Sequence, residues 1–218
     1  MGHALDTIKE FLSTGGPFMY VNCVFSAIAI AIIIERTIAL FRASLPGNAF
    51  MAQLMKQVRE GQIDRAKRLC EAAPKAALAR VCQSGLSRAN RGEQEVAAAL
   101  EEAILEQTPL LQKRIASLWS VANIATLTGL IGTISGLISS FKALGKAAPA
   151  QKAELLSKGI SEAMNNTAFG LSIAVICIGA HLLLTNRSKS MIEEMELSAM
   201  KLENLLARRA AGEVNPAE

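Results

Sequence analysis

Hydroxyl and amide side chains interrupt two long apolar stretches of this sequence, and their types suit them to handle an ion or its water. Asn123, Thr126 and Thr133 are spaced by three and seven residues, which places them on one face of a helix. Thr167 lies in the second stretch. A polar group in hydrocarbon must be satisfied by another helix or by water, so these residues are candidates for an ion pathway. The alternative for each threonine is a bond back to the carbonyl four residues earlier, which needs no function.

Thr133 and Thr167 are predicted to lie at the same depth. Thr133 precedes Lys142 by nine residues, and Thr167 follows Lys158 by nine. At about 1.5 Å per helical residue, each hydroxyl lies roughly 13 Å from the charge at its end of the stretch. Two antiparallel helices can therefore present both hydroxyls at one level.

The apolar stretches have no carboxylate near their middle, since Glu35 and Glu162 lie at their ends. A proton relay needs a mid-membrane acid whose pKa is brought toward neutrality by desolvation. If this chain conducts protons, another polypeptide should supply that acid. His181 is a rival relay residue, or else simply a packed or interfacial histidine. Sodium is an alternative ion, because the hydroxyls offer some of the oxygen ligands that hard cations need.

Three charge-free runs must position these residues, namely 11–34, 115–141 and 163–186. Each exceeds the roughly 20 apolar residues that a helix needs to cross hydrocarbon, and none keeps the polar stripe of a soluble core helix. The first run is followed by Glu35 and Arg36 rather than by a small-residue cleavage site, so we interpret it as a retained anchor instead of a signal peptide. The sequence predicts an all-α membrane protein with three transmembrane helices and long helices that extend into the cytoplasm.

The flanking basic residues favour a periplasmic N-terminus and a cytoplasmic C-terminus. The predicted layout is a periplasmic N-terminus (1–17), a first span (18–41), a cytoplasmic helical segment (42–114), a second span (115–141), a periplasmic loop (142–159), a third span (160–186) and a cytoplasmic tail (187–218). The helix that begins at Glu93 is expected to continue into the second span with a local adjustment at Pro109. The amphipathic tail is expected to extend the third span and to pack against other subunits, or else to be a solvated face.

Small residues at three- and four-residue spacing predict where the spans pack. Gly129, Gly132 and Gly136 lie largely away from the hydroxyl face of the second span, and Gly170 lies in the third. Such residues let helix backbones approach closely. The second span is therefore predicted to have a packed side and a wetter side.

Two motifs carry a resemblance to a known family. Residues 129–136 read GLIGTISG, which resembles the GLxGTVxG signature in the second span of ExbB and TolQ. Residues 160–171 read ISEAMNNTAFGL, which resembles the family's IxEALxxTAxGL segment, and Glu35-Arg36 resembles its ER pair. The resemblance extends over nearly the whole chain, whereas MotA, with four spans, is less similar. The chain departs from the family at Thr126 and Ser135, where members often have Pro and Trp.

The resemblance implies roles for particular residues and for a partner. Thr133, Glu162 and Thr167 match the family's polar pore-lining positions, and Glu35 and Arg36 match its inner-leaflet pair. The resemblance further implies a pentameric ring around the helix of a single-span ExbD/TolR-like partner that carries a membrane aspartate. Glu162 could equally be an interfacial charge at the helix N-terminus, and the Glu35–Arg36 pair could simply lie at headgroup level.

The predicted function is that of a pore-forming subunit of an ion-driven motor in the bacterial inner membrane, most simply powered by protons. It would energise TonB-type uptake, Tol-type envelope maintenance or gliding motility through a TonB/TolA-like or gliding effector. The alternatives are a non-conducting membrane scaffold and a sodium-driven motor.

Other classes of protein find little support in the sequence. No nucleophile with a base and no phosphate loop stands out, so we expect neither an enzyme nor a cofactor. The four cysteines are isolated, which argues against a metal site and against a disulfide framework. The net charge of +4 gives no specific sign of nucleic-acid binding and fits a loop near anionic lipid.

Overall fold

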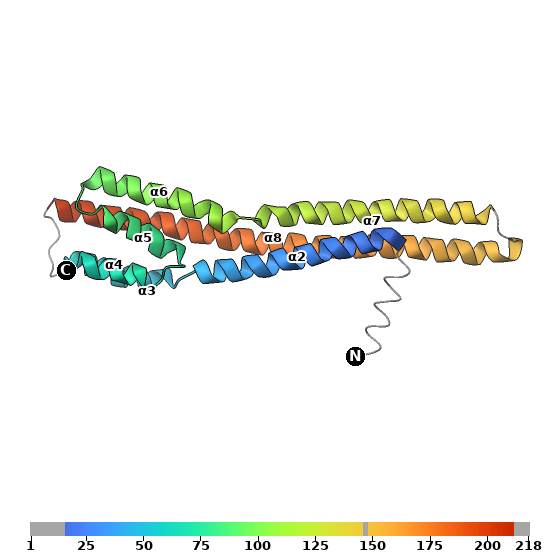
Figure 1. Cartoon of the computed structure of the whole chain (residues 1–218), viewed down its shortest axis with the longest axis horizontal. Coiled ribbons are helices and arrows are strands. Elements are labelled where there is room, and N and C mark those ends of the chain that lie inside the picture. Colours follow the sequence, from blue (N-terminus) through green and yellow to red (C-terminus); the bar gives the residue numbers. More distant parts are fainter. Residues whose placement is uncertain (1–15, 146–147, 212–218) are drawn as a thin grey trace, which may run out of the picture. The chain divides into compact units, whose positions relative to one another are not determined.

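The computed structural model describes residues 16–145 and 148–211, and within these residues all regular structure is helical (Figure 1). The elements are α2 (Gly16–Ala43), α3 (Gly47–Arg59), α4 (Ile63–Glu71), α5 (Ala77–Ser87), α6 (Glu93–Gln112), α7 (Ile115–Leu144), the short 3₁₀ helix η1 (Pro149–Gln151) and α8 (Lys152–Ala210). The predicted all-α class is confirmed. Most of the predicted N-terminal segment 1–17 and the end of the tail, from residue 212, lie outside the described residues.

Among the described residues, three helical stretches are long and apolar enough to cross a membrane: Gly16–Arg59, Glu93–Leu144 and Pro149–Ala210. Most of their apolar side chains are not covered within the single chain. Phe41, Val175 and Leu183 are 81%, 71% and 72% exposed. An apolar surface of this extent needs lipid or another subunit to cover it, which agrees with a polytopic membrane protein.

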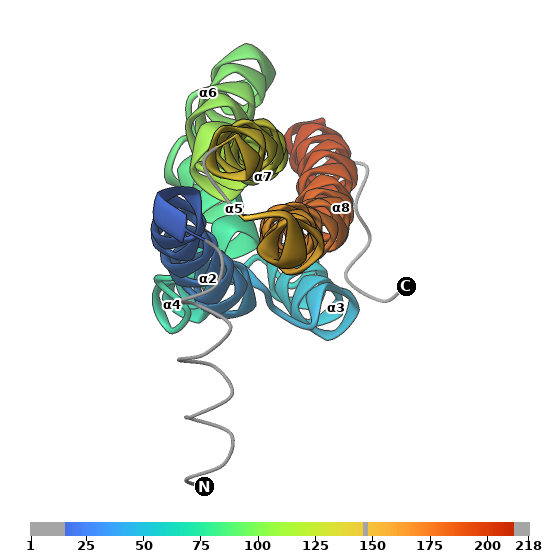
Figure 2. The ribbon, with the colours of Figure 1, turned by 90° about the vertical axis from the view of Figure 1, so that its right-hand side faces the viewer.

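The chain divides into two compact units. The apolar unit contains the first part of α2, all of α7 and the first part of α8, up to Leu183. Figure 2 shows α2, α7 and α8 nearly end-on. The core of this unit is built mainly of small side chains, which allow close helix contact. Its members are Ala29, Val121, Ala122, Ala125, Ile173, Ala174 and Cys177, flanked by Phe25 and Phe169.

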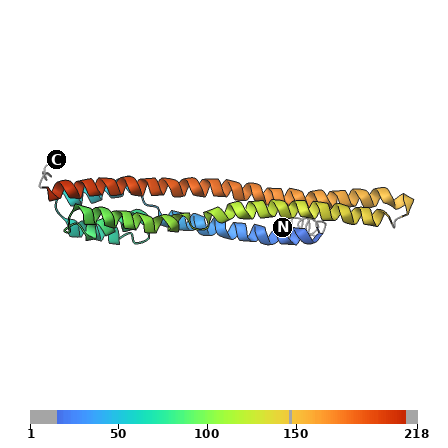
Figure 3. The same ribbon diagram turned by 90° about the horizontal axis from the view of Figure 1, so that it is seen from above.

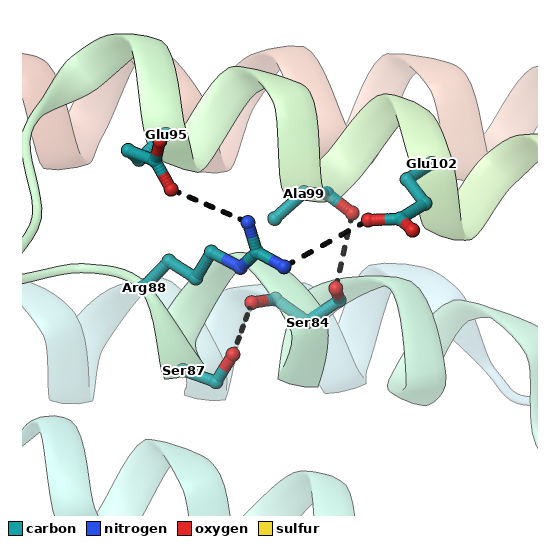
Figure 4. A network of polar contacts seen from close by, with 6 residues as sticks. All are labelled: Ser84, Ser87, Arg88, Glu95, Ala99 and Glu102. Carbon is teal, nitrogen blue, oxygen red and sulfur yellow. Dashed lines mark hydrogen bonds and ion pairs between the residues drawn. The ribbon is translucent and has the colours of Figure 1, made fainter.

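The polar unit contains residues Glu35–Lys113 together with α8 from Leu184 onward. Helix α5 packs on α4 and α6, and a Cβ on Gly85 would lie 2.6 Å from Cδ2 of Leu100, so a larger residue here would force the Leu100 side chain to move. Arg88 on the same face forms ion pairs with Glu95 at 3.3 Å and Glu102 at 3.8 Å (Figure 4). Next to it Ser84 donates a 3.0 Å hydrogen bond to the Ala99 carbonyl.

The third span and the tail form one uninterrupted helix, α8 (Figure 3), which confirms that the tail extends the span. Met191, Met195 and Leu202 on its apolar stripe are at most 6% exposed within the chain. The stripe predicted for contact with other subunits is therefore largely used to pack the polar unit itself. Leu197 and Met200, which are 52% and 56% exposed, remain on the outside of this helix.

The junction between α6 and α7 differs from the prediction. Pro109 lies inside α6, and the helix instead ends at Gln112. Lys113 is extended, and Arg114 takes a left-handed conformation with φ of 59°. A proline removes one backbone donor but leaves the other bonds of the ladder in place, whereas a left-handed residue turns the chain out of the helix. The predicted continuous helix is therefore interrupted four residues after the proline.

Two cysteines of the polar unit should be chemically inert in the folded protein. Burial, with a smaller effect of Glu71, raises the pKa of the Cys70 thiol to about 12, and burial, with a smaller effect of Cys70, does the same for Cys82. The thiolate is the reactive species, so neither residue should react with iodoacetamide at pH 8. A Ser87→Cys variant is a matched control, because Ser87 is exposed on the same helix as Cys82.

Alkylation followed by mass spectrometry would measure this. We expect prompt labelling of the Ser87→Cys thiol, and labelling of Cys70 and Cys82 only after denaturation. Labelling of Cys82 in the folded protein at the rate of the introduced thiol would contradict the packing of α5.

Candidate functional site

The hydroxyls of Thr133 on α7 and Thr167 on α8 are in direct contact inside the apolar unit. Both side chains are half-buried. The two helices run antiparallel, and the contact agrees with the common depth that was expected from the sequence. Thr133 also bonds to the Gly129 carbonyl at 3.0 Å, so the back-bonded arrangement and the contact between helices coexist.

The hydroxyls of the threonine pair have fewer hydrogens to donate than they have hydrogen-bond contacts. Besides touching each other, Thr133 lies 3.5 Å from the Ala163 carbonyl, and Thr167 lies 3.2 Å from the Gly129 carbonyl that Thr133 also uses. Each hydroxyl carries one hydrogen and two lone pairs, so only some of these contacts can be donated at once. Either hydroxyl can therefore turn to donate to a nearby anion or to accept from water without leaving its helix.

Glycines bring the α7 and α8 backbones together around the pair. A Cβ on Gly129 would lie 3.3 Å from Cα of Thr167, and a Cβ on Gly170 would lie 2.6 Å from the Ala125 carbonyl oxygen. A Cβ on Gly136 would lie 3.3 Å from the Cβ of Ala163. The predicted packing role of these glycines agrees with this geometry, and Gly132 faces the side chain of Asn166.

Glu162 lines a cavity of about 350 Å³ between α2, α7 and α8. The cavity extends toward the connection between α7 and α8, and its polar lining is Ser135, Ser139, Ser140, Lys158 and Glu162. Gly132 and Ala163, the neighbours of Thr133 and Glu162, also line it. A carboxylate, an ammonium and three hydroxyls make this space suitable for water and for a passing ion.

The side chains of Asn123 and Thr126 bond within their own helix, unlike those of the threonine pair. The Asn123 amide donates to the Trp119 carbonyl at 3.0 Å, and the Thr126 hydroxyl donates to the Ala122 carbonyl at 3.0 Å. Both bonds stay within α7. Asn123 is exposed and Thr126 is half-buried, so the polar face of α7 runs from the outside of the single chain at Asn123 to the contact with α8 at Thr133. Their place in an ion pathway stays a prediction.

Arg36 has a structural role that the sequence did not reveal. It is 6% exposed, pairs with Glu35 at 2.7 Å and donates to the carbonyls of Leu110 at 3.4 Å and Lys113 at 3.1 Å. These carbonyls belong to the last turn of α6, whose own ladder stops there. Arg36 therefore caps the end of α6 while it stays paired with Glu35, and the level of this pair in the membrane stays a prediction.

His181 is bound at the start of α7. Its Nδ1 lies 3.0 Å from the Ile115 carbonyl oxygen, and its ring centroid lies 6.0 Å from that of Trp119. A carbonyl can only accept, so Nδ1 carries the hydrogen in this contact. This geometry favours the packed histidine over the relay residue.

Two buried amides were missed by reasoning from motifs. Asn22 on α2 is 0% exposed and Asn166 on α8 is 1% exposed. Asn166 lies next to Thr167, and Asn22 is the one amide within the first apolar run. An uncharged amide in such a run is itself the signal that could have identified Asn22.

A comparison with protein families identifies the family to which this chain belongs. The sequence model of the MotA/TolQ/ExbB proton channel family matches residues 73–197, which is more than half of the chain. The chain belongs to the MotA/TolQ/ExbB proton channel family. It is therefore a multi-pass membrane subunit of the ExbB/TolQ type, a transport component and not an enzyme.

Individual relatives agree with this family. The chain is 30% identical over 171 residues to "Putative biopolymer transport protein ExbB-like 3" of Synechocystis, covering 77% of this chain and 78% of the relative. It is 31% identical over 116 residues to "Tol-Pal system protein TolQ" of Pseudomonas aeruginosa, covering 52% and 49%. An ExbB homolog of Methanothermobacter thermautotrophicus is 30% identical over 121 residues, covering 55% and 42%. For the last two relatives the chain spans about half of their length or less.

The close approach at Gly170 can be tested with a matched pair of variants on α8. In Gly170→Ala the new methyl would lie 2.6 Å from the Ala125 carbonyl oxygen, which is backbone and cannot move aside cheaply. We expect a loss of roughly 1–3 kcal/mol in stability from this overpacking. Gly179→Ala is the control, because no atom lies within 4 Å of the added methyl in the chain.

Thermal unfolding in detergent would measure both variants. The control should equal the wild type or exceed it slightly, since alanine favours helix over glycine. Equal stability of Gly170→Ala and Gly179→Ala would contradict the described α7–α8 packing.

Proposed function

We propose that this chain forms the pore wall of an ion-driven motor and shares its ion site with a second polypeptide. The observation that carries the proposal is the contact between Thr133 and Thr167 in a part of the chain that has no acid of its own. The sequence has no Asp or Glu from 115 to 153 or from 163 to 192, and Glu162 lies nearer the helix end. A charge carried through this region has hydroxyls to bind it and no carboxylate in this chain to hold it.

The missing acid is proposed to come from an ExbD/TolR-like partner with one membrane helix that carries an aspartate. Hydroxyl donors favour the ionised form of a carboxylate, and losing those donors favours the protonated form. The threonine pair can offer or withdraw a donor because its hydrogens are shared among several carbonyls. Rotation of the partner helix past successive threonine pairs would then couple protonation to movement.

The surfaces of the chain support assembly around such a partner. Leu130, Ile134 and Ile138 on α7 are each at least half exposed in the single chain, close in sequence to the half-buried Thr133. Apolar faces of this kind need neighbours or lipid. We propose a homo-oligomer, a pentamer by the family resemblance, in which the threonine pairs of all copies face one central helix.

The ion is proposed to enter through the cavity that Glu162 lines. In the proposed orientation the α7–α8 connection is periplasmic and the C-terminus is cytoplasmic, in a bacterial inner membrane. Glu162 attracts a cation toward the cavity, and the serines hydrate it on the way to Thr133. Thr126 and Asn123 then continue the polar face toward the cytoplasmic end of α7. The Glu35–Arg36 pair is proposed to lie at the inner leaflet, where Arg36 also caps α6.

The process that the motor drives is proposed from the names of the related proteins. Biopolymer transport and the Tol-Pal system appear in the names of the matched proteins. Uptake of the TonB type and envelope maintenance of the Tol type are therefore the first candidates, through a TonB/TolA-like effector. Gliding motility is a third.

Replacing Thr167 by alanine tests the ion site. A hydrogen bond to a charged group contributes about 1.5–3 kcal/mol, so we expect at least a tenfold loss of motor activity in Thr167→Ala with the complex intact. Ser172→Ala is the matched control, because Ser172 is exposed on the same helix and donates to the Ala168 carbonyl at 2.8 Å within that helix. Growth dependent on the driven process measures activity, and co-purification of the partner measures assembly.

The same pair of variants separates the motor from a scaffold. A non-conducting scaffold would keep both its complex and its activity in Thr167→Ala. Full activity of that variant, at wild-type levels of complex, would therefore reject the shared ion site.

Reconstitution tests the missing acid directly. The purified chain alone in liposomes should not dissipate a pH gradient faster than empty liposomes do, because it has no mid-membrane carboxylate. Co-reconstitution with the aspartate-bearing partner should open the route, and a partner with that aspartate replaced by asparagine should close it. Repeating the assay in sodium-free buffer distinguishes a proton route, which persists, from a sodium route, which does not. A selective proton leak through the chain alone would overturn the proposal.

A further inference from the structure

The apolar unit buries two amide side chains whose polar atoms lack partners. Neither Nδ2 nor Oδ1 of Asn22 has a hydrogen-bond partner among the described residues, and the same holds for Oδ1 of Asn166. Both residues are at least 99% buried. An amide in an apolar environment without hydrogen bonds costs roughly 1–3 kcal/mol by mutational data, and a membrane interior offers no bulk water to relieve it.

Glycines make the space that these amides occupy. The Asn166 amide fills the position where a side chain on Gly132 would begin. The Asn22 amide nitrogen lies 3.2 Å from the position that a Cβ on Gly170 would take, and the Ala125 carbonyl oxygen lies 2.6 Å from the same point. The two amides are thus held in neighbouring recesses where α2 meets α7 and α8. Asn166 and Gly170 are one helical turn apart on α8, so the recesses are about 6 Å apart along the axis.

The recess at Asn166 adjoins the cavity that Glu162 lines, because Gly132 borders both. Gly132 and Phe18 both belong to the wall of that cavity. A Cβ on Gly132 would lie 3.1 Å from the Cβ of Phe18. Asn166 therefore lies directly behind the cavity wall, and Asn22 lies one turn further along.

The unpaired atoms identify the ligand. Asn22 presents both a donor and an acceptor, and Asn166 presents an acceptor. A bare cation would satisfy the oxygens and leave the Asn22 nitrogen unpaired, whereas water both donates and accepts. Buried water typically makes two to four hydrogen bonds to groups of this kind.

We propose that Asn22 and Asn166 bind ordered water between α2, α7 and α8, and that this water extends the outer cavity behind the threonine pair. The hydrated recess supports Thr133 and Thr167 from the side of the helix core, away from the exposed face of α7. It makes α2 part of the polar machinery instead of a plain anchor. The inference concerns hydration alone and stands whether or not the assembled protein conducts an ion.

Hydroxyl-radical footprinting by X-ray radiolysis tests the proposal on the intact complex with its partner. Radicals form from water next to the residue that they oxidise, so a buried side chain is modified only where bound water lies beside it. Met19 is 0% exposed and one turn before Asn22 on the same face of α2. Cys177 is the internal control, because it is also 0% exposed and lies in the dry cluster of Ala29, Ala125 and Ala174.

We expect Met19 to be oxidised at least about fivefold faster than Cys177 in the wild type. Thiols and thioethers are both readily oxidised, so this difference would report the water beside Met19. In Asn22→Leu the rate at Met19 should fall to that of Cys177. Equal rates at Met19 and Cys177 in the wild-type complex would overturn the proposal without any variant. An unchanged Met19 rate in assembled Asn22→Leu would overturn the role of Asn22.

A second variant covers the case in which Asn22→Leu does not assemble. Gly132→Ala keeps Asn22 but places a methyl where the Asn166 amide lies, between the cavity and the recess. The Met19 rate should then fall at least about threefold if water enters from the cavity. A Met19 rate equal to the wild type would reject that route.

Discussion

A polar group inside hydrocarbon has to find its hydrogen bonds within the protein, and this requirement organises the apolar unit. Thr126 and Asn123 bond back within α7, while Thr133 and Thr167 share the Gly129 carbonyl and touch each other. Glycines allow this sharing, because only their absent side chains let the α7 and α8 backbones come so close. Small residues are therefore the condition for the polar contacts and not a separate feature of the packing.

The same requirement explains the break between α6 and α7. The last carbonyls of α6 have no helical partner, and the buried guanidinium of Arg36 binds two of them, at Leu110 and Lys113. Arg36 is itself neutralised by Glu35 at 2.7 Å. An arginine at the end of one apolar helix thus stabilises the end of another, and the ion pair keeps its charge from being buried alone.

In the proposed ion site, the threonine pair can orient an ion but cannot compensate its charge. Neutral hydroxyls can donate to a carboxylate or accept from water, but they carry no charge to compensate a proton in transit. By its family membership the chain is a membrane subunit of the ExbB/TolQ type. In the proposed motor, a pore wall that lacks its own acid would stay closed to protons until a partner supplies one, which would couple conduction to assembly.

The sequence alone determined the helical class, the three membrane stretches, the family and the common depth of Thr133 and Thr167, because each follows from the length of apolar runs, from motif spacing or from the constant rise of a helix. That their hydroxyls touch was decided by the tertiary structure. It did not determine where α6 ends. Pro109 is the visible signal, but a left-handed Arg114 and the carbonyls bound by Arg36 end the helix later. Nor did it show the recesses of Asn22 and Asn166, or that Met191 and Met195 pack within the chain. These depend on which helices meet at which level, and a contact between residues far apart in sequence leaves no local pattern to read.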